Sequence, residues 1–135
     1  ESVKRTVKRT EQLYGPLDDA QVKLISGGVA ASPFNPEMWV AERQRRQQDT
    51  LQTLRRLVAD KADRDTRVAA LRALVARTER SAHAEYRAYQ LKLADYNCGL
   101  AALVHNATSA AQRQKARDTL KGWEEDLRSL TAAAR

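Results

Sequence analysis

The stretch that decides the fold is residues 86–130, YRAYQLKLADYNCGLAALVHNATSAAQRQKARDTLKGWEEDLRSL. Apolar side chains recur in it at steps of three and four, in two sets separated by the polar break at residues 105–109. The first set is Tyr86, Tyr89, Leu93, Tyr96, Leu100 and Leu103, and the second is Ala116, Leu120, Trp123, Leu127 and Leu130. Residues at this spacing share one helix face, and two such faces joined by a short turn pack together. The pattern predicts a long antiparallel helical hairpin.

The rest of the sequence also predicts helices. Glycine and proline are few, five and three in 135 residues, and alternating β-branched runs are absent. Gly15-Pro16 ends a first helix over residues 2–14. The later starts are marked by capping residues, namely Asp18 or Asp19, Asn35 before Pro36, Asp63 or Asp65, Ser81, and Thr108 or Ser109. We therefore predict an all-α fold, with residues 1–135 forming a single domain that is an irregular antiparallel bundle of about six helices.

The positive charge is unevenly placed along the chain. The net charge is +7, and residues 41–80 hold eleven basic and six acidic side chains, a net of +5. A basic balance favours nucleic acid, anionic lipid or acidic proteins as partners. The candidate binding surface consists of Arg43, Arg45, Arg46, Arg55 and Arg56. The alternative is a solvated helix face with ion pairs at i,i+4, from Glu42 to Arg46 and from Arg45 to Asp49.

The remaining reactive or aromatic residues have structural interpretations. The tyrosine stripe, Trp39 and Trp123 are expected in the core, with phenol oxygens at its rim. Cys98, the only cysteine, is expected to be a buried filler. His83 and His105 have no other metal-ligand residues at suitable spacing, and His105 is placed to bond a last-turn carbonyl.

Several classes of function lack their sequence signals. The chain has no phosphate-binding glycine loop, no nucleophile elbow and no zinc-binding helix motif, so we expect no enzyme, no cofactor and no metal site. No turn has the composition of a helix-turn-helix, and no aromatic residues interleave the basic ones. These absences argue against nucleic-acid recognition.

The chain resembles a family of uncharacterised bacterial lipoproteins. The likeness covers nearly all of it and rests on residues 13–15, 32–36, 42–49, 51–57, 86–89, 97–98, 105–106, 112–113 and 120–127. The resemblance implies the C-terminal half of a lipid-anchored precursor whose helical part faces the periplasm, attached to the membrane only through an upstream anchor. The chain begins with Glu1 inside an expected helix, which fits a processed product or a fragment.

A weaker resemblance is to the small all-α periplasmic chaperones of the Spy and CpxP kind. Their Leu-Thr-x-x-Gln motif is partly matched at residues 17–21, with Asp18 for Thr, and at residues 108–112. An ordinary capping box explains both matches equally well.

Three functions follow as hypotheses. The first is a non-enzymatic envelope lipoprotein that binds other envelope proteins or has a structural role. The second is a holdase for unfolded clients that uses the five arginines beside apolar patches. The third is a cytoplasmic nucleic-acid binder. The sequence leaves the partner and the oligomeric state open.

Overall fold

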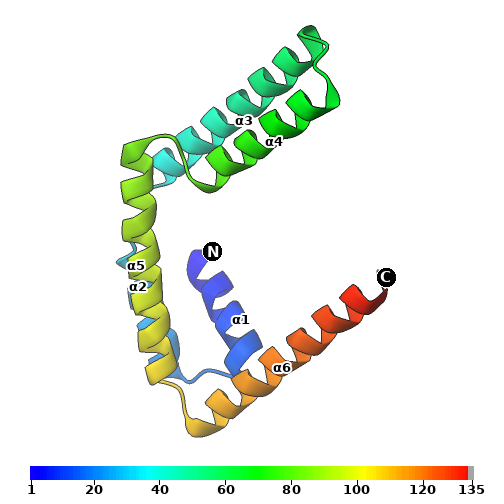
Figure 1. Cartoon of the computed structure of the whole chain (residues 1–135). Helices are drawn as coiled ribbons and strands as arrows, with labels where there is room; N and C mark the ends of the chain where they lie inside the picture. Colours follow the sequence, from blue (N-terminus) through cyan, green and yellow to red (C-terminus); the bar gives the residue numbers. More distant parts are fainter. Residues whose placement is uncertain (134–135) are drawn as a thin grey trace. The chain divides into compact units, whose positions relative to one another are not determined.

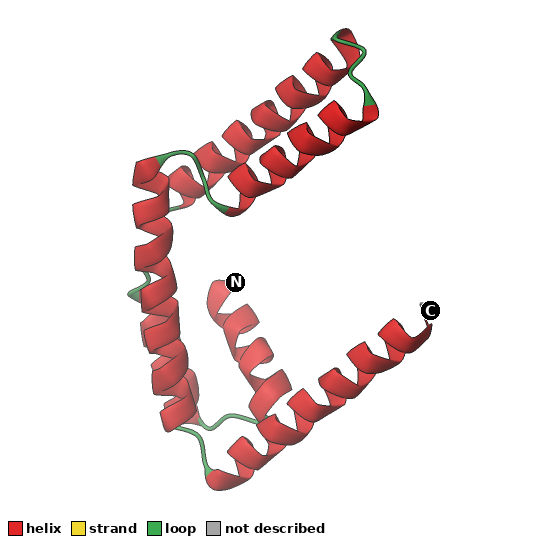
Figure 2. Cartoon of the chain, in the orientation of Figure 1, coloured by secondary structure: helices red, strands yellow, loops and turns green. Residues whose placement is uncertain are grey.

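The computed structural model describes residues 1–133, and every regular element among them is an α-helix (Figure 2). The helices are α1 (Ser2–Tyr14), α2 (Asp19–Ala30), α3 (Pro36–Ala59), α4 (Arg64–Glu79), α5 (Ala84–Asn106) and α6 (Ala110–Ala133), and they follow one another along the chain in Figure 1. The all-α fold and the six helices predicted from the sequence are confirmed.

Local hydrogen bonds fix the helix starts, and most of them involve the capping residues predicted from the sequence. The Asp18 carboxylate accepts from the Gln21 N–H at 2.8 Å, and the Gln21 side chain accepts from the Asp18 N–H, which closes a capping box. Ser109 and Gln112 form the same box at the start of α6. Asn35 and Asp63 cap α3 and α4. Both partial chaperone motifs thus contain capping boxes.

The start of α5 differs from the prediction. We expected Ser81 to cap this helix, but the first helical hydrogen bond runs from the Arg87 N–H to the His83 carbonyl, at 3.0 Å. Ser81 is instead buried, 1% exposed, and its hydroxyl accepts from the His83 N–H at 3.2 Å. The hydroxyl therefore orders the turn before α5, two residues ahead of the cap position.

The chain divides into two compact units, which we describe separately. Unit 1 combines residues 1–32 with the chain from Asp95 onward, and unit 2 is Pro33–Ala94. The single domain expected from the sequence stays a prediction. In unit 1, α1 packs against α2 and α6, and the buried apolar side chains are Ile25, Val104 and Ala116.

The starts of α2 and α6 are joined by a pair of side-chain amides in unit 1. Gln21 Nε2 donates to Gln112 Oε1 at 2.9 Å, and Gln112 Nε2 donates to Gln21 Oε1 at 3.0 Å. Each amide also reaches a backbone carbonyl, Ala107 for Gln21 and Pro16 for Gln112. Because these are the two capping-box glutamines, each helix start is bound to the other.

Helices α2 and α5 approach each other closely at Gly28. A methyl group built on this glycine would lie 2.8 Å from Leu100 Cδ2 and 3.1 Å from Leu100 Cγ. The Tyr96 hydroxyl donates to the Gly28 carbonyl at 2.6 Å. A side chain at this position would have to displace Leu100.

The end of α6 is less covered than the sequence suggests. The two long helices are joined by a short turn as predicted, but the predicted packing of their apolar faces against each other is wrong. Helix α6 packs against α1 and makes no extended contact with α5, so the second apolar set remains open, with Trp123 50% and Leu127 64% exposed. Helix α1, the neighbour of α6, has 13 residues against 24 in α6, so it covers only part of its length. The prediction that Trp123 is core is wrong because α5 does not cover this part of α6, and Trp39, 43% exposed, is also outside the core.

Candidate functional site

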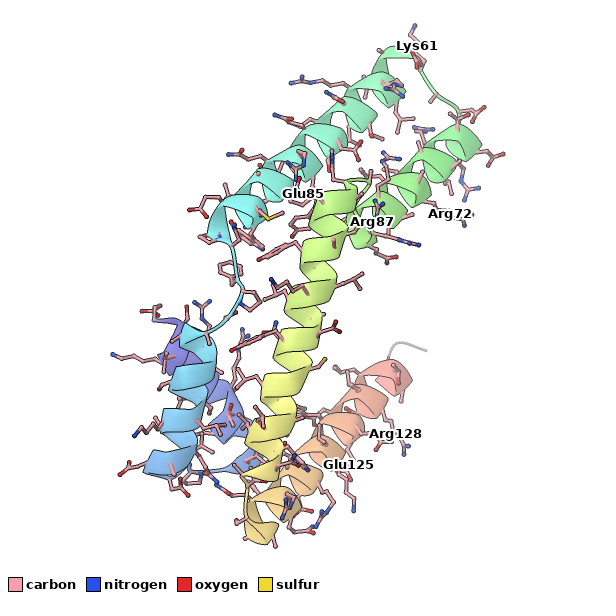
Figure 3. The ribbon with its side chains drawn as sticks, turned by 90° about the vertical axis from the view of Figure 1, so that its left-hand side faces the viewer. Lys61, Arg72, Glu85, Arg87, Glu125 and Arg128 are labelled. Carbon is pink, nitrogen blue, oxygen red and sulfur yellow. The ribbon has the colours of Figure 1, made fainter. Side chains whose placement is uncertain are left out.

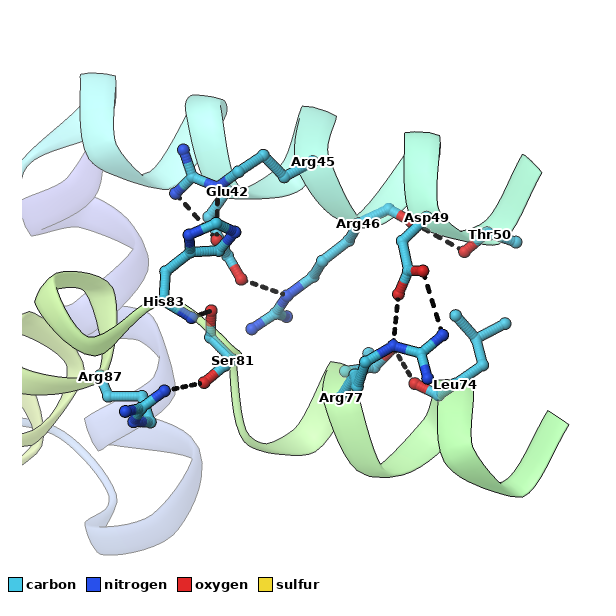
Figure 4. A network of polar contacts seen from close by, with 11 residues as sticks. Glu42, Arg45, Arg46, Asp49, Thr50, Leu74, Arg77, Ser81, His83 and Arg87 are labelled. Carbon is cyan, nitrogen blue, oxygen red and sulfur yellow. Dashed lines mark hydrogen bonds and ion pairs between the residues drawn. The ribbon is translucent and has the colours of Figure 1, made fainter. Parts of the chain in front are cut away.

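In unit 2, α3 and α4 form an antiparallel hairpin closed by a bidentate ion pair. Arg77 Nε and Nη2 donate to the two Asp49 carboxylate oxygens at 2.9 and 3.0 Å (Figure 4). The hydrogen bonds from Arg77 lower the pKa of Asp49, and those to Asp49 raise the pKa of Arg77. The predicted pair between Arg45 and Asp49 is wrong, because Asp49 faces α4 and not the preceding turn of its own helix.

A buried carboxylate lies at the base of this hairpin. Glu42 is 3% exposed and receives Arg45 Nη2 at 2.9 Å and Arg46 Nε at 3.2 Å, so the predicted pair with Arg46 is confirmed. Burial tends to raise the pKa of Glu42, but hydrogen bonds from Ser81, Arg45 and Arg46 outweigh burial and lower it. Glu42 therefore stays ionised at neutral pH inside unit 2.

The tyrosines beside this carboxylate are structural, as the sequence suggests. Tyr86 is buried, 6% exposed, with the Arg46 guanidinium 5.8 Å from its ring centre. Burial raises the pKa of the Tyr86 hydroxyl. The half-buried Tyr89 accepts from the Asn35 N–H at 2.9 Å, and so holds the entry to α3.

The five candidate arginines do not form one surface. Arg45 and Arg46 neutralise Glu42, and the Arg43 guanidinium lies 5.4 Å from the centre of the Trp39 ring. Arg55 and Arg56 are exposed. At roughly 100° of rotation per residue, the five point in several directions around α3.

An apolar surface on the same hairpin was not identified from the sequence. It consists of three exposed residues on α3 and three on α4, which we call the hairpin face: Leu51, Leu54, Val58, Val68, Leu71 and Val75. These side chains are between 37% and 77% exposed, and on α4 they line a shallow hollow together with Arg72.

Helix geometry places both halves of the hairpin face on one side of the hairpin. On α3, Leu54 follows the half-buried Thr50 by four residues, a rotation of about 40° away from the α3–α4 contact. On α4, Val75 comes one residue after the half-buried Leu74, which faces the contact. It is therefore rotated by about 100° from the contact, in the same sense as Leu54 on α3, and Leu71 lies on the same side as Val75. In an antiparallel pair, rotation in one sense from the contact leads to the same side on both helices. The spacing signal was present in the sequence, but it equally fits a stripe buried against other helices.

Polar side chains gather in a second hollow of unit 2, near Glu42. It is lined by Met38, Ala41, Arg45, His83, Ala84, Glu85 and Tyr86. No group of three or more His, Cys, Asp or Glu side chains within residues 1–133 is placed to hold a metal ion.

Two predictions in unit 1 are corrected. Cys98 is exposed, because it lies on an outer side of α5. His105 does not bond a last-turn carbonyl through its ring; its Nδ1 lies 2.8 Å from the Tyr14 hydroxyl, joining α5 to α1.

No helix in the described part of the chain is long and apolar enough to span a membrane. The chain matches no protein-family model, no curated protein and no solved structure.

Proposed function

We propose that this chain is a non-enzymatic, protein-binding part of an envelope lipoprotein, and that the hairpin face is its contact surface. The observation that carries this proposal is the clustering of six exposed aliphatic side chains on one side of α3 and α4. Single exposed apolar residues need no explanation, but contiguous ones mark interaction sites.

The shape of the surface fits a helical partner. Its two stripes are antiparallel, with apolar residues at steps of three and four on each helix. A third amphipathic helix that lies between such stripes buries its own i, i+3, i+4 and i+7 residues against them. The Asp49–Arg77 pair joins α3 to α4, and Glu42 is paired with Arg45 within α3, so neither carboxylate occupies this face.

Crosslinking tests the contact surface. A photoreactive amino acid at Leu71 of the full-length native protein should give a discrete crosslinked species in cells. The matched control is Gln52, which is exposed and lies two residues before Leu54, hence about 200° away on α3. Equal crosslinking at both positions, or none at Leu71, contradicts the proposal.

The envelope location rests on the sequence resemblance and needs its own measurement. We expect the intact native precursor to carry acyl chains and to be recovered with membranes. An unmodified cytosolic protein would contradict the location and restore the nucleic-acid hypothesis.

A holdase role is the second candidate, supported by two exposed arginines that border the hairpin face. Arg55 follows Leu51 by four residues, and Arg72 lies in the α4 hollow. We expect suppressed aggregation of an unfolding client, weakened by salt and by Arg55→Glu with Arg72→Glu. No suppression at several-fold molar excess rules this role out.

A further inference from the structure

Helix α6 carries a second exposed apolar surface, in unit 1. It consists of Leu120, Trp123, Leu127 and Leu130, which we call the α6 stripe, with exposed fractions of 51%, 50%, 64% and 67%. The spacing of three, four and three residues places them on one helix side. An apolar helix side of this kind could pack against the hairpin face.

Carboxylates border the α6 stripe on both edges. Glu124 lies four residues after Leu120 and three before Leu127, and Asp126 lies three after Trp123 and four before Leu130. Residues three and four apart are neighbours on a helix surface. Glu124 also pairs with Arg128 on its own helix, and Arg117, three residues before Leu120, is the basic neighbour of the α6 stripe. The labelled Glu125 and Arg128 lie along the same helix in Figure 3.

Arginines border the hairpin face in a matching arrangement. Arg55 lies four residues after Leu51 and three before Val58, and Arg72 lies four after Val68 and three before Val75. Figure 3 shows Arg72 on α4, with Lys61 in the turn of the hairpin. Asp65, three residues before Val68, is the acidic neighbour on α4. Across residues 41–80 the balance is nevertheless strongly basic.

We propose that the α6 stripe of a second copy of this chain docks on the hairpin face, with Glu124 and Asp126 opposite Arg55 and Arg72. This inference rests on the proposed function, because it names the occupant of the same surface. One chain carries both surfaces, each apolar at helical spacing, with arginines beside the hairpin face and two carboxylates beside the α6 stripe. Reciprocal exchange between two chains closes a dimer.

The test is a charge exchange between two variants of the full chain. Variant A is Arg55→Glu with Arg72→Glu, and variant B is Glu124→Lys with Asp126→Lys. We expect the wild type to dimerise with concentration in sedimentation equilibrium at low salt. Each variant alone should associate at least about tenfold more weakly, since like charges then face each other. Lys23→Glu with Lys92→Glu, which changes two exposed positive charges elsewhere to the same extent as variant A, should leave association unchanged.

Mixing variants A and B should restore association, because each hairpin face then meets an α6 stripe of opposite charge in the other chain. A contact within one chain cannot be restored by mixing. A monomeric wild type at high concentration, or no recovery in the mixture, overturns the inference. Crosslinking from Leu71 to a different protein in cells would then leave the proposed function standing, whereas loss of both results would remove both.

Discussion

Adjacent glycines in α2 provide a matched pair of substitutions with opposite expected effects. Gly27 has no heavy atom within 4 Å of an added methyl group, so Gly27→Ala should stabilise unit 1 by up to about 1 kcal/mol through helix propensity. Gly28→Ala gains the same propensity but drives its methyl group into the Leu100 side chain. Overpacking of this kind costs about 1–3 kcal/mol.

The difference between the two variants is therefore the informative quantity. We expect Gly28→Ala to be about 1–3 kcal/mol less stable than Gly27→Ala, since propensity cancels between them. The assay is urea unfolding followed by circular dichroism, together with hydrogen exchange of peptides from α2 and α5. Exchange is needed because two compact units need not unfold in one transition.

A second substitution checks the cause. Leu100→Ala removes the atoms that meet the new methyl group, so Gly28→Ala should be less harmful in that background than in the wild type. If Gly28→Ala is as stable as Gly27→Ala, the close approach of α2 to α5 is refuted.

Three further predictions concern single residues. Glu42→Gln should lower the free energy of unfolding at pH 7 by about 1–3 kcal/mol. Because the folded-state pKa of Glu42 is lowered, its stabilising contribution is present above its ordinary pKa of about 4.5 and is lost as pH falls below it, so the difference in stability from the wild type should shrink in acid. Cys98 should react with a thiol reagent in the native protein nearly as fast as in urea, and strong native protection would contradict its exposure. Tyr14→Phe removes the bond to His105 at an exposed site and should cost less than about 1 kcal/mol by thermal unfolding, with a larger loss indicating that this contact is buried.

Local signals account for what the sequence could predict. The capping hydrogen bonds of Asp18 and Asn35 lie within the first turn of their own helices. They therefore form independently of how these helices pack in the fold. The buried Tyr86 was likewise predictable, because most stripes of that kind are core. Helix number and helix ends follow from such signals.

Whether an apolar helix face is buried depends on which other helices pack against it. The amphipathic stripe around Trp123 predicts a buried side chain, yet α6 makes no extended contact with α5, which carries the other stripe. Asp49 has one arginine four residues before it and another on α4, and only the folded hairpin decides between Arg45 and Arg77. For the same reason the hairpin face was visible as two stripes but not as an exposed surface.

The paired amides of Gln21 and Gln112 have a consequence for the order of folding. This contact spans 91 residues, whereas Asp49 and Arg77 are 28 residues apart. Closing a longer loop costs more entropy, about 0.6 kcal/mol for each doubling, so the α3–α4 hairpin should form first. Once the Asn35–Tyr89 bond has joined the two ends of unit 2, a much shorter loop remains to be closed. Unit 2 is inserted between the two segments of unit 1, so its prior folding lowers the entropy cost of bringing these segments together.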